Sequence, residues 1–422
     1  LIIAASTIDG DLTLTSGATA GITDSGTVTV LGDIYLITDA GNGVIDMGTL
    51  AVTGSVDLAT HGSGDATLVN ATALDFAAST VGGELTATAT TGNITQSGSL
   101  DINGTGTTTI TASASGADIT LFNAANDFEG ALSTAGDDVD LWSADTLDLG
   151  AATVTGDYLV YAGTSIDDSG AQIITGDAAF YTHDDASQIT LDHPGNSFGG
   201  SFNTVGGIGY LVSDTSLDGI VLIGRTLEGN VIVTAAGPVT QSGALIVGGF
   251  TSISAAGQNV TLTDASNDFK QEVRLTGAAV EIVDTNGIDL GASTVTGTYQ
   301  VTAGGAVTNS GTQEITGVTT ITAGSSNNIT LDHATNNFAA AVEIASGNDV
   351  AITDEDAIIL GASTVSGTYD ITAGGAVTNS GTLEISGITT IAAGSSNNIT
   401  LNSAANNFAA AVEIASGNDV AI

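Results

Sequence analysis

Residues 329–352 read ITLDHATNNFAAAVEIASGNDVAI, and residues 399–422 read ITLNSAANNFAAAVEIASGNDVAI. The two stretches are identical from Phe338 to Ile352 and from Phe408 to Ile422. Whole units that recur in tandem are typical of repeat architectures, in which each unit packs against its neighbours. This duplication decides the fold class, and the rest of the chain can be compared with it.

The same unit can be followed toward the amino terminus through markers that keep a fixed order. These markers are a Ser-Gly pair, an Ile-Thr-Leu-like triplet and an Asn-x-Phe group. The Ser-Gly glycines are Gly26, Gly98, Gly170, Gly243, Gly311 and Gly381. The phenylalanines of the third marker are Phe128, Phe198, Phe269, Phe338 and Phe408. The spacing of roughly 70 residues indicates about six tandem repeats, of which the first is divergent.

The local pattern within a repeat predicts short strands. In Tyr369–Thr372, large apolar residues alternate with polar ones, which is the period of a β-strand. Asn, Ser and Gly gather between such runs, as in Ala323–Asn328, and these residues favour turns. Stacked parallel coils explain both the strands and the tandem order, and crossover chirality favours a right-handed winding. We therefore predict an all-β fold, a right-handed parallel β-helix (β-solenoid) with about three coils per repeat.

No linker or shift in composition interrupts the array. We expect residues 1–422 to form a single continuous solenoid, with the marker phenylalanines pointing into an aliphatic core. The chain starts in a strand-like run without an initiator Met and stops within a repeat. Both ends are therefore expected to be cut from a longer protein.

The charge balance excludes several classes of partner. Against 46 acidic residues the chain has three basic ones, Arg225, Lys270 and Arg274, so its net charge is −43. Such a chain repels nucleic acids and anionic lipid surfaces. It contains no cysteine for a disulfide framework, and no apolar run is long enough to span a bilayer. The high charge favours a salty, divalent-rich and therefore extracellular medium.

Four segments of the most regular repeat carry a resemblance. They are Asn336–Ile344, Asn348–Ile352, Leu360–Val365 and Ala376–Gly381. The sequence resembles the repeats of filamentous-haemagglutinin-like large exoproteins, which are two-partner-secretion and autotransporter-type surface proteins of Gram-negative bacteria. This resemblance implies a right-handed β-helix, export across the outer membrane, and roles in adhesion, biofilms or filaments.

Enzymes also use β-helices, so acidic pairs need to be weighed as catalytic groups. Paired carboxylates of the kind that hydrolyse glycosides occur at Asp137-Asp138, Asp184-Asp185 and Asp354–Asp356. They are spread over many coils and are better interpreted as solvated turns. A polysaccharide lyase would need a basic residue beside bound calcium. We expect Lys270 and Arg274 instead to lie in one strand and to pair with Glu272 between them, so we predict no catalytic residues and no enzyme.

Metal and modification sites are equally sparse. The histidines are His61, His183, His193 and His333, and the last two share one register but lie too far apart along stacked coils to share a metal ion. No EF-hand or calcium β-roll motif is present. We predict no cofactor, and only weak, distributed calcium binding with ligands unknown. Sequons at Asn93, Asn103, Asn328 and Asn398 are interpreted as stacked asparagines rather than glycosylation sites.

Three functions remain open in order of preference. The first is a structural stalk or filament segment of a secreted cell-surface protein, associating with itself end to end or laterally. The second is a glycan- or receptor-binding face on the same solenoid, to be sought in the divergent segment Gly176–Leu211 with its Tyr181, His183 and Pro194. The third is a polysaccharide lyase or hydrolase.

Overall fold

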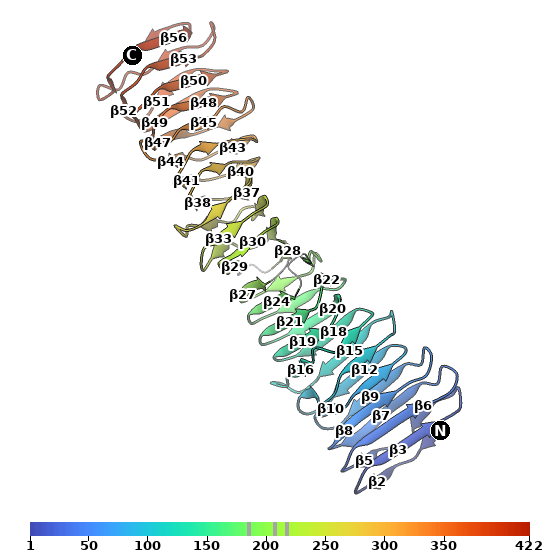
Figure 1. The fold of residues 1–422 in the computed structure, drawn as a ribbon. Helices are drawn as coiled ribbons and strands as arrows, with labels where there is room; N and C mark the ends of the chain where they lie inside the picture. Colours follow the sequence, from blue (N-terminus) through green and yellow to red (C-terminus); the bar gives the residue numbers. More distant parts are fainter. Residues whose placement is uncertain (184–186, 206–208, 216–218) are drawn as a thin grey trace. The chain divides into compact units, whose positions relative to one another are not determined.

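The computed structural model describes residues 1–183, 187–205, 209–215 and 219–422. Throughout these ranges the regular secondary structure is strand, without any helix, and every strand pairing is parallel. None of the described segments is a helix long and apolar enough to cross a membrane. The chain divides into two compact units, Leu1–Ser216 and Leu217–Ile422. Figure 1 shows the short strands stacked along each unit.

A coil of the first unit consists of three short strands, one on each face. One such coil contains β21 (Tyr158–Ala162), β22 (Ile166–Asp168) and β23 (Gln172–Ile174). The next contains β24 (Ala178–Thr182), β25 (Gln188–Leu191) and β26 (Ser197–Phe198). Each strand pairs with its counterpart in the next coil. The predicted β-solenoid is thus confirmed, with about 20 turns in all.

Each repeat contains three coils and one additional strand. On one face, Ile119 pairs with Val139, Val139 with Tyr158, and Tyr158 with Ala178, which completes three coils. Ile189 is the next copy of the Ile119 marker, and it lies in the strand that follows, on the neighbouring face. The second unit behaves alike. There the chain of pairs from Val260 reaches Thr319 after three coils, and the next marker strand, β45 (Ile329–Leu331), follows it on the neighbouring face. Equivalent residues of successive repeats therefore lie on different faces.

The interior of the coils is apolar, as the alternation predicted. Phe128, Phe198, Phe269 and Phe338 are between 0 and 3% exposed, which confirms their inward orientation. Phe408, in the last of the described coils, is half-buried. Burying such a ring contributes roughly 1.5–3 kcal/mol, about as much as each of the buried Ile, Leu and Val side chains that make up most of the core.

The Ser-Gly marker has a steric explanation. A Cβ on Gly381 would lie 2.1 Å from the backbone nitrogen of Ala362 in the adjacent coil. At Gly311 the corresponding distance, to the nitrogen of Ala292, is 2.2 Å. Only glycine allows two backbones to approach this closely. The glycine is therefore a packing requirement at these turns, whereas at Gly26 and Gly243 the nearest atom would lie 3.2 Å from a Cβ.

Buried amides join the coils inside the solenoid. Asn336 is fully buried, and its Nδ2 donates to the carbonyl of Leu331 at 3.0 Å. Its Oδ1 accepts the backbone N–H of Gln313 at 3.0 Å and the Nδ2 of Asn309 at 2.8 Å. Asn126, Asn196 and Asn267 occupy the same position and are also fully buried. These bonds satisfy polar groups that would be costly to bury alone.

Candidate functional site

A column of aromatic rings lies on the outer face of four consecutive coils of the first unit. Trp142, Tyr161 and Tyr181 are direct neighbours in β19 (Val139–Ser143), β21 and β24. Phe122 follows β16 (Ile119–Leu121) and is 36% exposed, whereas the other three rings are half-buried. We call these four residues the aromatic column.

The rings of the column contact one another closely. The centroids of Tyr161 and Tyr181 are 4.3 Å apart with nearly parallel planes, and those of Trp142 and Tyr161 are 5.1 Å apart. Phe122 packs with its edge against Trp142 at 5.0 Å. Such pairs stabilise neighbouring strands by about 0.5–1.5 kcal/mol each. Each of the four residues is still partly exposed.

A second column, of carboxylates, precedes the same four strands. The aspartate column consists of Asp118, Asp138, Asp157 and Asp177, each immediately before its strand. The Oδ1 of Asp138 accepts the backbone N–H of Asp157 at 2.8 Å, and the Oδ1 of Asp157 accepts that of Asp177 at 2.8 Å. Each carboxylate is thereby held at the spacing of the coils.

The electrostatic field of this face is uniformly negative. Between the columns, burial raises the pKa of Asp140 above its usual range, and Asp138 and Asp118 raise it further. The pKa of Tyr161 is also raised, mainly by burial and then by Tyr181. The three basic residues of the chain all follow position 216, so the first unit has no Lys or Arg to balance the carboxylates.

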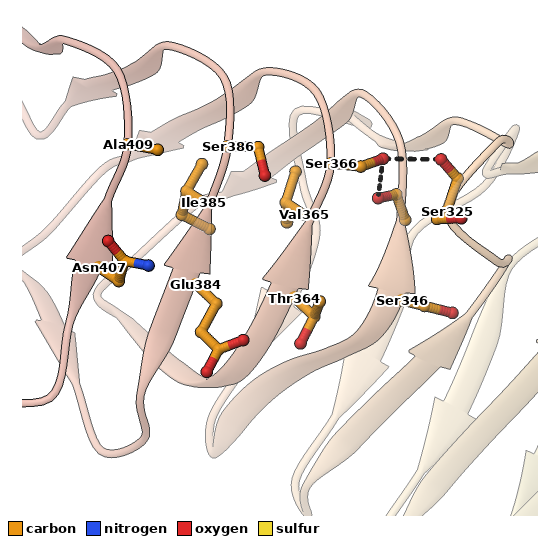
Figure 2. Close-up of a pocket in the computed structure, with 11 residues that line it drawn as sticks. Ser325, Ser346, Thr364, Val365, Ser366, Glu384, Ile385, Ser386, Asn407 and Ala409 are labelled. Carbon is orange, nitrogen blue, oxygen red and sulfur yellow. Dashed lines mark hydrogen bonds between the residues drawn. The ribbon is translucent and has the colours of Figure 1, made fainter.

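A polar groove runs across several coils of the second unit (Figure 2). Its volume is about 170 Å³, and hydroxyl and amide side chains line most of it. The Ser366 hydroxyl donates to the carbonyls of Ser325 at 2.7 Å and Gly347 at 3.2 Å. These bonds hold the turn at Ser325 against one end of the groove. Glu384 is the single carboxylate in its lining. The groove therefore offers hydrogen bonds but no pair of carboxylates for glycoside hydrolysis.

Carboxylates crowd a second recess, in the first unit. Its lining includes Asp127, Glu129, Asp145 and Asp148, around a volume of about 380 Å³. The pKa of Asp127 is raised, first by burial and then by Glu129, Asp145 and Asp101. Across the described ranges, however, no three His, Cys, Asp or Glu residues converge in a way that could hold a metal ion.

A family model with the description "Repeats of unknown function (DUF5649)" matches the chain five times. The matched residues are 63–135, 136–205, 211–276, 277–345 and 347–415. The chain belongs to this family. No curated protein and no solved structure matches it. The DUF5649 matches agree with the repeat length inferred from the markers, and the aromatic column crosses the boundary between the first and second matched repeats.

The predicted ion pairing of the basic residues is partly wrong. Arg274 pairs with Glu272 as expected, and its guanidinium carbon lies 5.1 Å from the centroid of the Phe250 ring. Lys270 pairs with Asp268 instead, and it does not share a strand with Arg274. Strand β36 ends at Phe269 and β37 begins at Val273. Phe269 and Val273 are both buried on different faces, so the chain has to turn between them.

The interpretation of the acidic pairs as solvated turns is wrong at Asp354. This residue is the last of β48 (Val350–Asp354), is 1% exposed and accepts the Phe338 N–H at 3.0 Å. The histidines lie in separate turns. The Nδ1 of His61 lies 2.7 Å from the carbonyl oxygen of Gly41, and that of His333 lies 3.1 Å from the Thr335 hydroxyl. His193 Nδ1 accepts the Gly195 N–H at 3.1 Å. His183 is exposed beyond β24, and Asp184-Asp185 lie outside the described residues.

The sequon asparagines bond between coils. Asn93, Asn328 and Asn398 each accept, through Oδ1, the backbone N–H of an aspartate in the next coil at 3.0–3.3 Å. Asn328 and Asn398 also accept the Nδ2 groups of Asn348 and Asn418 at 3.0 Å, so these two sequons take part in asparagine pairs between coils. Asn103 is exposed just after a strand.

Sequence reasoning missed most of the aromatic column. Only Tyr181 lies in the segment that we singled out for a binding face. A signal was nevertheless present, because the four aromatic residues stand at positions 122, 142, 161 and 181. The intervals between these positions equal the separations of paired residues in the successive coils, for example Ile119 with Val139 and Val139 with Tyr158.

Proposed function

We propose that this chain is a structural stalk or filament segment of a secreted, adhesin-like protein on the surface of a Gram-negative bacterium. The observation that supports this proposal most is the near-identity of residues 329–352 and 399–422 within the stacked coils of the second unit. A stalk gains reach from every added copy, whereas an enzyme gains nothing from copies that lack its catalytic groups. The resemblance to filamentous-haemagglutinin-like exoproteins points the same way.

The chemistry of the surface fits an extracellular support. In a solenoid each repeat is stabilised by its neighbours, so length can change without loss of the core. A net charge of −43 keeps separate copies apart at low salt and allows them to approach when salt or divalent ions screen it. Self-association, end to end or laterally, is part of this proposal, and so is the absence of a catalytic role.

One test uses the duplication itself. Deletion of residues 329–398 joins Asn328 to Ile399, which follows Asn398 in the intact chain, so the sequence across the junction is unchanged. Ile399 then takes the place of Ile329 and can pair with Val307 as it does with Val377 in the intact chain. The deletion removes about three coils, which is ~15 Å of length, so the readout is the location of the protein rather than fibre length. We expect the shortened protein to fold and to reach the surface of the source bacterium, where immunogold electron microscopy should label it in fibres. Antibody labelling confined to the interior of intact cells would contradict the proposal.

A further inference from the structure

The solenoid does not need the aromatic column in order to fold. In the second unit, four strands have the same pairing and the same spacing as the strands of the column. They are β35 (Val260–Leu262), β38 (Val280–Asp284), β41 (Tyr299–Ala303) and β44 (Thr319–Thr322). At the positions of the aromatic column these strands carry or precede Thr263, Val283, Thr302 and Thr322.

The aspartate column is missing from that face as well. The residues before the same four strands are Asn259, Ala279, Thr298 and Val318. Both columns are therefore additions to a scaffold that folds with small residues in their place. Their coincidence on one face of four coils indicates a role other than stability.

The face presents two parallel rows of different chemistry. Each aromatic residue lies four positions after the aspartate of its coil, so the rows lie ~13 Å apart in extended chain, and each row advances by ~4.8 Å per coil. Within the described parts of the chain, the Trp142 indole N–H and the Tyr161 hydroxyl have no hydrogen-bond partner. The Tyr181 hydroxyl accepts a bond from Asn203 Nδ2 at 3.3 Å.

We propose that this face binds an extended, arginine-rich segment of a partner polypeptide. Charge complementarity selects a cationic occupant, because carboxylates form one row, Asp140 lies between the rows, and this unit contains no Lys or Arg. Guanidinium groups pair with carboxylates and also stack on aromatic rings, so arginine suits both rows, whereas an anionic glycan or nucleic acid would be repelled. The chain itself shows this combination on a small scale, where Arg274 pairs with Glu272 and lies over Phe250.

The intact 422-residue protein contains its own reporter for this face. Trp142 is its only tryptophan, so its fluorescence responds to an occupant of the aromatic column without a label. The probes are a synthetic peptide of alternating Arg and Thr, the Lys-Thr analogue, and a neutral N-acetylglucosamine hexamer, each titrated in 0.15 M NaCl. We expect the Arg-Thr peptide to change the fluorescence saturably and to bind more tightly than the Lys-Thr peptide.

Two double variants and a matched control separate this site from general attraction to an acidic protein. Tyr161→Thr/Tyr181→Thr keeps the net charge and the reporter, and it should raise the Kd of the Arg-Thr peptide about tenfold. Asp138→Ala/Asp157→Thr should raise it by a similar factor. Asp370→Asn/Glu413→Gln removes the same charge from exposed positions of the second unit and should change the Kd less than about twofold.

Three results would overturn the inference. The first is an unchanged Kd of the Arg-Thr peptide in the tyrosine variant. The second is a Kd that rises as much in the Asp370→Asn/Glu413→Gln control as in the Asp138→Ala/Asp157→Thr variant. Either result would show that the peptide is bound only by the general negative charge of the protein. The third is a response of Trp142 to the hexasaccharide but not to the Arg-Thr peptide, which would identify a glycan as the occupant. Loss of the ring contacts should lower the Tm of the tyrosine variant. Because every residue introduced at the face stands at the equivalent position of the second unit, each variant should still show the wild-type circular dichroism spectrum at the temperature of the titration.

Discussion

The carboxyl group of Asp168 should make the stability of the first unit depend on pH. In the equivalent position the other repeats have the amides Gln96, Gln241, Asn309 and Asn379, each bonded to the buried Asn of the Asn-x-Phe marker. Asp168 is 7% exposed and accepts bonds from the Asn196 Nδ2 at 2.6 Å and the Asp192 N–H at 2.9 Å. Burial nevertheless dominates and raises the pKa of Asp168 from 3.8 to about 6.

The sign and size of the effect follow from proton linkage. Because the folded state holds the proton more tightly than the unfolded state, the contribution of this group to the free energy of unfolding falls as the pH rises through the folded pKa. A shift of about two units corresponds to on the order of 3 kcal/mol, lost between pH 4 and pH 7. About 2 kcal/mol of that loss lies between pH 4.5 and pH 8.

The substitution Asp168→Asn removes the titration but keeps the size of the side chain. Relative to wild type, the variant should gain about 2 kcal/mol of stability between pH 4.5 and pH 8, whatever constant offset the altered hydrogen bonds introduce. The assay is urea unfolding at fixed ionic strength, with hydrogen exchange of peptides covering residues 166–198 to follow this region alone.

A reciprocal variant is the control for this prediction. Asn309→Asp places a carboxyl group in the second unit where Asn309 is 8% exposed, and it should introduce a new loss of stability as the pH rises. Parallel pH profiles of wild type and Asp168→Asn between pH 4.5 and pH 8 would refute the reasoning about Asp168.

The remaining predictions concern the core, the turns and the charge. Phe338→Ala should lower the free energy of unfolding by about 3–5 kcal/mol, measured by urea unfolding, and a loss below 1 kcal/mol would contradict a close-packed ring. Gly381→Ala should cost about 1–3 kcal/mol because its Cβ meets backbone, whereas Gly48→Ala, with nothing within 4 Å, should be nearly neutral in the same assay. Raising NaCl from 0.01 to 0.15 M shortens the Debye length from ~30 to ~8 Å and should raise the Tm, because the carboxylates then repel one another less. CaCl2 at matched ionic strength should raise the Tm further, because calcium can bridge carboxylates. Equal responses to the two salts would show that calcium acts only by screening.

Much of the fold follows from local pattern. The burial of Phe338 and its counterparts could be predicted because alternation assigns alternate residues to the interior, and the turns could be located from Gly and Asn. The prediction of one strand containing both Lys270 and Arg274 was wrong. The chain turns between two faces there, but the sequence contains no Gly, Pro or Asn to indicate the turn, because polar residues continue through it. The position of Asp168 was not predicted either, because its burial depends on Asn196 in another coil.

The sequence by itself determined the strand-and-turn unit, its period and the negative charge of the surface, since these depend on residue type and order. Which residues share a face was decided only by the tertiary structure. Each marker moves to a neighbouring face in the next repeat, because β20 (Leu147–Val154) serves two faces and the repeat length is not a whole number of coils. The same winding brings Trp142, Tyr161 and Tyr181 into one column, because parallel pairing aligns residues that are one coil apart. The number of residues in each coil depends in turn on how its side chains pack in the core of the solenoid.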